Sequence, residues 1–232
     1  MLWRSLCVSL SLAMQNKVIC YDNSRAFLEE VGEVLYSRET INNLILGVSE
    51  RLVMDPQAYQ NPFFASVNNE SGEMLLASVM TPPHPMILAG GKHFARGLSA
   101  LIPYLQRNGI ALPGVIGPVQ ISEEFEKIWR RRTRQPGKIR MNQRVYELRS
   151  VRLPPLPEGQ FRIAMPQDSR KVAAWLQSFS QEALSETAVS EEERAQSLIR
   201  EGHVFVWENN SEAVSMALKT RPIAHSITIS GV

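Results

Sequence analysis

The sequence has little cysteine. It contains two in 232 residues, Cys7 and Cys20, and both lie near the N-terminus. Two cysteines cannot build a disulfide framework or a four-thiolate zinc site. The sequence has four histidines, His84, His93, His203 and His225. No two of them have the short spacing that is typical of metal ligands. We therefore expect no metal site.

Long apolar runs and an excess of charge of one sign are also missing. Lys and Arg number 25 against 23 Asp and Glu, and 44% of the residues are hydrophobic. A disordered chain would combine low hydrophobicity with high net charge, and a membrane-spanning helix needs about 18 or more apolar residues in a row. We expect a soluble globular protein of one large or two small domains, without a membrane partner.

Residues 1–22 form an N-terminal extension with the outline of a short signal peptide. Arg4 precedes an apolar run over residues 6–14, and Ser11-Leu12-Ala13 has the small-x-small pattern of a cleavage site. Serines interrupt this run, and it ends at a second methionine, Met14. These features favour a start codon placed too early, or an unstructured extension, over secretion. We expect a cytoplasmic protein.

From Asn23 the hydrophobic pattern becomes regular and predicts a first domain over residues 23–152. Helical spacing covers residues 27–35 and 41–52, and alternating apolar residues indicate three strands after them. The expected strands span residues 63–68, 74–80 and 86–89, and a helix over 92–106, a strand over 115–119, a helix over 122–132 and a strand over 140–152 follow.

A proline cluster over residues 153–159 predicts a linker, and a second domain is expected over residues 160–232. There a strand at 161–165 precedes a helix that Asp168 is placed to N-cap. A second helix over 191–200 and strands over 203–208, 213–220 and 226–230 complete the series.

The strands after Phe63 and after Val204 are similar in sequence. Both segments place Asn-Asn at the first turn, Thr-x-Pro after the second strand and Gly at the end of the third strand. Such a repeat predicts two copies of one supersecondary unit. The first copy continues beyond Gly90 for about 60 residues, whereas Gly231 is followed by Val232. We therefore expect one complete copy and one half copy.

This ordered set resembles the GNAT superfamily of N-acetyltransferases. The segments that carry the resemblance are residues 38–47, 81–84, 112–118 and 144–148 in the first half, and residues 161–165, 175–182 and 222–232 in the second half. The resemblance implies an α+β or α/β fold, with a mixed, mostly antiparallel sheet flanked by helices. It also implies acetyl-CoA as co-substrate and a small-molecule or peptide amine as acceptor.

In that family acetyl-CoA lies between the fourth and fifth strands, and a glycine-rich loop at a helix N-terminus holds its pyrophosphate. Such a loop would follow Val232. The resemblance therefore leaves backbone contacts from Ile229, Ser230, Gly231 and Val232. The first copy has Gly90-Gly91-Lys92-His93 at a helix start, but this spacing does not match the family's loop. We expect a degenerate, non-catalytic first copy.

Transfer to an amine requires a group that accepts its proton. Glu182 is the best carboxylate candidate, because it borders the apolar stripe of Trp175 and Phe179 and partial burial would raise its pKa. The competing interpretation is a solvated glutamate at a helix end. Glu208 and His225 are weaker candidates.

The leading interpretation is an acetyltransferase whose acetyl-CoA binding is weak or lost in this chain. The alternative is a non-catalytic fragment that acts as a binding module, or as a dimerisation module through which two copies form a homodimer. A third interpretation is a basic RNA- or DNA-binding module. It is based on residues 127–152, which contain ten Lys or Arg and one Glu. Its aromatic residues are limited to Trp129 and Tyr146, so we expect no nucleic-acid partner.

Overall fold

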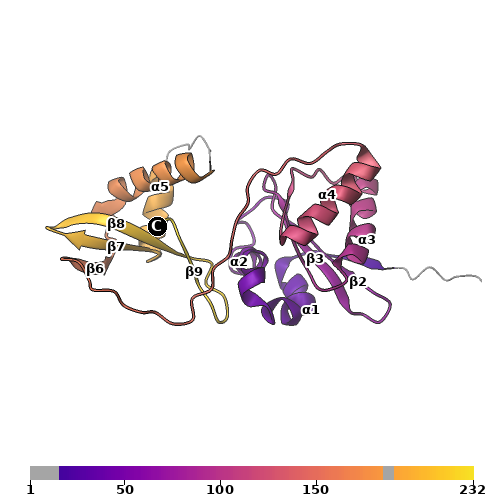
Figure 1. Cartoon of the computed structure of the whole chain (residues 1–232), viewed down its shortest axis with the longest axis horizontal. Coiled ribbons are helices and arrows are strands. Elements are labelled where there is room, and N and C mark those ends of the chain that lie inside the picture. Colours follow the sequence, from indigo (N-terminus) through magenta and orange to yellow (C-terminus); the bar gives the residue numbers. More distant parts are fainter. Residues whose placement is uncertain (1–15, 185–190) are drawn as a thin grey trace, which may run out of the picture. The chain divides into compact units, whose positions relative to one another are not determined.

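The computed structural model describes residues 16–184 and 191–232, without the side chains of residues 183 and 184. The chain is a mixed α+β protein that divides into two compact units, residues 1–143 and 144–232 (Figure 1). The described residues form six α-helices and two mostly antiparallel sheets.

The first unit is built on a five-stranded sheet in the order β1-β2-β3-β4-β5. Its elements are β1 (Lys17–Tyr21), α1 (Ser24–Tyr36), α2 (Glu39–Met54), β2 (Phe63–Asn68), β3 (Met74–Met80), β4 (Met86–Gly90), α3 (Phe94–Arg107), β5 (Val115–Ile116) and α4 (Val119–Thr133). The first four strands pair antiparallel, and β4 pairs with β5 in parallel. The sheet is therefore mixed, with its parallel pair at one edge.

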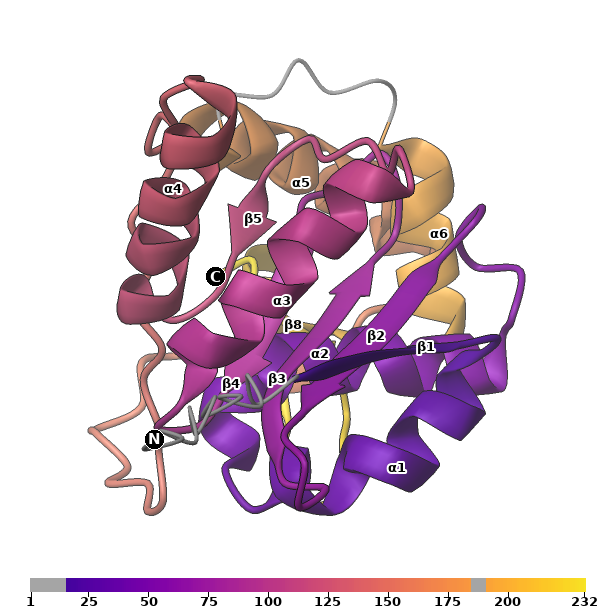
Figure 2. The same cartoon turned by 90° about the vertical axis from the view of Figure 1, so that its right-hand side faces the viewer.

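Helices cover both faces of this sheet, with α1 and α2 on one face and α3 and α4 on the other (Figure 2). Leu76 and Leu88 pack with Leu98, Leu101 and other residues of α3 and α4. Strand β3 is buried from Leu75 to Met80. This double burial explains why its sequence is almost continuously apolar instead of alternating.

Local side-chain chemistry fixes two of the boundaries in this unit. The Asn23 side chain accepts a hydrogen bond from the Ala26 amide at 2.9 Å and so caps α1. In the β2–β3 turn, Asn69 Oδ1 accepts from the amides of Ser71 and Glu73, at 3.1 and 2.9 Å. Asparagine side chains often stabilise turns in this way, and the turn expected between the strands over residues 63–68 and 74–80 is confirmed.

Two features of the first unit differ from the sequence prediction. Strand β1 lies within residues 1–22 and pairs with β2, so the sheet begins before Asn23. The strand expected over residues 140–152 does not form, and residues 134–159 contain no helix or strand and are exposed throughout. Its apolar residues match a strand pattern, but no neighbouring strand in the described chain pairs with it.

The second unit contains a four-stranded antiparallel sheet in the order β6-β7-β8-β9. Its elements are β6 (Gln160–Ile163), a 3₁₀ turn (Pro166–Asp168), α5 (Ser169–Leu184), α6 (Glu192–Arg200), β7 (Val204–Asn209), β8 (Glu212–Thr220) and β9 (Thr228–Ser230). Val172 and Leu176 of α5 and Ile199 of α6 share a core with the sheet. The order of strand, helix pair and three antiparallel strands thus occurs in both units.

Asp168 does not N-cap α5 as expected. It ends the 3₁₀ turn, and its Oδ2 accepts a hydrogen bond from the Met165 amide at 2.7 Å. The same carboxylate binds the Arg162 guanidinium through two hydrogen bonds, at 2.7 and 3.1 Å. A charged partner within reach outcompetes the helix amides for this side chain.

Candidate functional site

The parallel pair β4–β5 is the first candidate region, because the resemblance places a cofactor between these strands. Met86 pairs with Val115, and Ile87 pairs with Ile116. The chain then passes directly against β4, since a Cβ on Gly117 would lie 2.7 Å from the Leu88 carbonyl oxygen. Only glycine allows this approach, and the two strands stay together as far as Leu88.

The glycine pair after β4 has a packing role at its first position. A Cβ on Gly90 would lie 2.9 Å from the Phe94 Cβ and 3.0 Å from the Leu75 carbonyl oxygen. At the start of α3, the Phe94 and Arg96 amides donate to the carbonyl oxygens of Gly91 and His93, at 3.3 and 3.0 Å. Carbonyl groups of the loop therefore accept hydrogen bonds from two of the amides in the first turn of α3.

Glu182, the sequence candidate for a catalytic base, lies in the last turns of α5. Its side chain is exposed, so the expected partial burial is wrong. Its role as a base stays a prediction. His225 is also exposed, in the connection between β8 and β9.

Glu208 belongs to a compact ion-pair cluster with Arg162 and Asp168. Its carboxylate accepts from Gln160 Nε2 at 2.8 Å and from Arg162 Nε at 2.6 Å, and these bonds hold its pKa below the usual value. The Arg162 guanidinium likewise lowers the pKa of Asp168, and the two carboxylates raise that of Arg162. A carboxylate held ionised by two donors is a poor proton acceptor, so the cluster fits a structural role.

The four residues expected to contact a cofactor lie at and after β9. This strand pairs with β8 and ends the sheet of the second unit in the described residues. Ile229 and Val232 are exposed, and Ser230 Oγ lies 3.3 Å from Thr220 Oγ1. Gly231 is buried with φ of 59°, and a Cβ there would lie 2.9 Å from Leu218 Cδ1. Their contact with a cofactor stays a prediction.

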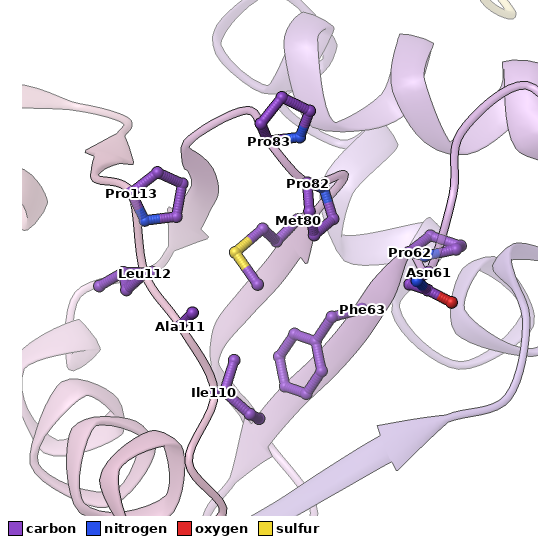
Figure 3. Close-up of a pocket in the computed structure, with 10 residues that line it drawn as sticks. All are labelled: Asn61, Pro62, Phe63, Met80, Pro82, Pro83, Ile110, Ala111, Leu112 and Pro113. Atoms are coloured by element: carbon purple, nitrogen blue, oxygen red, sulfur yellow. The ribbon is translucent and has the colours of Figure 1, made fainter.

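The first unit also contains an apolar pocket that the sequence reasoning did not identify. It lies between the start of β2, the end of β3 and the segment before β5, and has a volume of about 760 Å³ (Figure 3). The lining residues are Asn61, Pro62, Phe63, Met80, Pro82, Pro83, Ile110, Ala111, Leu112 and Pro113. None of them titrates near neutral pH, so the pocket suits an apolar group rather than acid–base chemistry. The feature of the sequence that points to this pocket is the proline-rich turn after β3.

The described residues contain neither a metal-binding cluster nor a membrane-spanning helix. No group of three or more His, Cys, Asp and Glu side chains is arranged to hold a metal ion there. None of the helices in that part of the chain has the length and apolar composition needed to cross a membrane. No protein-family model, curated protein or solved structure matches the chain.

Proposed function

We propose that the chain is a GNAT-type N-acetyltransferase, with acetyl-CoA as donor and a small-molecule or peptide amine as acceptor. The observation that carries the proposal is the topology of the first unit. A strand, a helix pair and three antiparallel strands precede a helix and a parallel edge strand, in the order β1-β2-β3-β4-β5. This is the layout of that superfamily, and a single parallel pair at β4–β5 is its most specific part.

We also propose that the two units are tandem copies. Each has a helix pair between its first and second strands, and each carries a register shift just before the first turn of its meander. The shifts lie at Val67/Asn68 and at Trp207/Glu208. When the Asn-Asn turns are aligned, the two shifts lie one position apart, near the end of the first meander strand of each unit. Similar irregularities in the two units support a common origin, because turn chemistry alone does not require them.

We assign donor binding to the second unit and regard the first as non-catalytic. The close approach of Gly117 to Leu88 supports this choice, because it leaves no space between β4 and β5 there. In the second unit, the backbone of residues 229–232 at the sheet edge would pair with the amide groups of the pantetheine arm. Glu182, on α5, would accept the proton of the amine, and we expect a cytoplasmic location.

Ligand-observed NMR of the full chain with acetyl-CoA tests the assignment. We expect a dissociation constant of roughly 1 mM, since backbone contacts alone supply only about 4 kcal/mol of binding free energy. The Gly231→Ala variant introduces a Cβ at positive φ against Leu218, so its affinity should fall by about tenfold. Gly72→Ala is the matched control, because Gly72 has φ of 82° in a turn with no heavy atom within 4 Å of the new Cβ.

The outcomes separate the site from the function. Absence of binding at millimolar acetyl-CoA contradicts the proposal that this chain binds and uses acetyl-CoA. Binding that Gly231→Ala leaves unchanged contradicts the assignment to β9 and moves the donor site elsewhere.

A second candidate function is a binding module formed by the first unit. The apolar pocket supports it, since its lining is mostly apolar and contains no catalytic side chain. A shift in the NMR signals of Met80 or Leu112 on addition of an aliphatic acyl chain would favour this function.

A further inference from the structure

The sheet of the second unit carries its apolar core on one face only. Val204, Val206, Met216 and Leu218 are buried on the face that packs against α5 and α6. Because successive residues of a strand point to opposite faces, their neighbours lie on the other face. We call this other face of β6–β9 the outer face.

The outer face consists of cross-strand rows that the strand register defines. The rows are Phe161–Trp207–Ser215, Ile163–Phe205–Ala217 and Lys219–Ile229. Phe161, Ile163 and Ile229 are 65%, 53% and 58% exposed, and the rings of Phe161 and Phe205 stack with centroids 5.4 Å apart. In the first unit, by contrast, helices cover both faces of the sheet.

We propose that the outer face is a homodimer interface that packs against the same face of a second copy. A two-fold interface brings each residue close to its own counterpart, so it must avoid like charges at its centre. Of the residues in the three rows, Lys219 alone is charged, and it lies in the row at the β9 side. The Trp207 indole N–H donates to the Glu158 carbonyl oxygen at 3.1 Å, so the ring can be buried without loss of a hydrogen bond.

The size of the patch agrees with a modest interface. Phe161, Ile163 and Ile229 each expose roughly 100 Å², and the partly exposed Phe205, Trp207 and Ala217 add to this. The total exposed area is about 400 Å², which is more than single exposed apolar residues provide. It is about half of the ~800 Å² that each partner of a standard interface buries. Two copies would bury about 800 Å² in total through these rows, the size of a weak interface.

The composition of the outer face favours a second sheet over a nucleic acid. Two sheets pack face to face about 10 Å apart, with side chains like these between them. A single-stranded nucleic acid also stacks on exposed rings, but it requires several cations beside them. The outer face provides one, Lys219.

Sedimentation velocity of the full chain over roughly 1 to 100 µM tests the proposal. We expect a monomer–dimer equilibrium whose dissociation constant rises at least about tenfold in Ile163→Lys, because the substitution places two ammonium groups in an apolar interface. Ile41→Lys is the matched control. Ile41 has nearly the same exposure, 51%, but lies on α2 in the first unit, so its dimerisation should match wild type.

Circular dichroism checks that each variant remains folded, and Ile229→Lys replaces Ile163→Lys if that variant unfolds. A wild-type chain that stays monomeric over this range overturns the proposal. Equal dimerisation of the wild type and the folded outer-face variant also overturns it, because the interface would then lie elsewhere. Binding of a fluorescent oligouridine by a monomeric chain would assign the rings to nucleic acid instead. The acetyl-CoA titration is independent of all three results.

Discussion

Replacement of Arg162 by alanine should lower the stability of the second unit more than replacement of an exposed arginine lowers stability. Its guanidinium joins β6 to the 3₁₀ turn and to β7, through hydrogen bonds to Asp168 at 2.7 and 3.1 Å and to Glu208 at 2.6 Å. Loss of one partner from a buried ion pair costs about 3–5 kcal/mol. The Arg162 side chain is 17% exposed, so we expect the lower end, ~3 kcal/mol.

Urea unfolding, followed by tryptophan fluorescence, measures this change. Replacement of Trp3 and Trp129 by phenylalanine leaves Trp175 and Trp207 as reporters of the second unit. The matched control is Arg149→Ala. Arg149 also binds a carboxylate, that of Glu147 at 3.1 Å, but it is 83% exposed, so its loss should cost less than about 1 kcal/mol.

The acid dependence of stability provides an independent check on the same cluster. The Arg162 hydrogen bonds lower the pKa of Asp168 below its value in the unfolded chain. The stabilisation is therefore complete above the unfolded pKa, near 4, and is lost as the pH falls through the folded pKa. Asp168→Asn should be less stable at neutral pH and should show a smaller loss of stability below pH ~4.

Either of two results would refute this reasoning. One is an equal destabilisation by Arg162→Ala and Arg149→Ala, which would mean that burial does not strengthen the cluster. The other is an unchanged acid dependence in Asp168→Asn, which would place the titrating group elsewhere.

Two further predictions concern the first unit. Gly97→Ala should lower stability by about 1–3 kcal/mol in thermal unfolding, because its Cβ would lie 2.7 Å from the Leu76 Cβ where α3 crosses β3. Gly91→Ala, with no heavy atom within 4 Å of the new Cβ, should change stability by less than about 0.5 kcal/mol, and a similar loss in both variants would contradict the packing argument. Asn23→Ala should cost about 1 kcal/mol in urea unfolding through loss of the α1 cap, and an unchanged midpoint would show that the bond to the Ala26 amide contributes little.

The sequence predicted those elements that have a strong periodic pattern. The α1 and α2 stripes, the Asn69 turn and the strands on either side of it were identified because their local chemistry agrees with their burial. Strand β1 was missed because its five residues, KVICY, follow an apolar stretch that resembles a leader. Its pairing with β2 is a long-range contact, and no local pattern indicates it.

The site predictions were limited by the same physical cause. Burial of Glu182 depends on which elements pack around the end of α5, and helical spacing alone does not determine that. Asp168 has the sequence position of a cap, but Arg162, six residues earlier, takes its carboxylate across the 3₁₀ turn. The apolar pocket is assembled from three separated segments, so no single motif contained it.

The exposed connection over residues 134–159 has a practical consequence. It offers a protease an extended backbone without secondary structure, and it includes Lys138, Arg140, Arg144 and Arg149 as sites for trypsin. Brief digestion of the native chain should therefore cut here first and release two fragments. Fragments obtained in this way would allow each unit to be crystallised, melted and titrated separately.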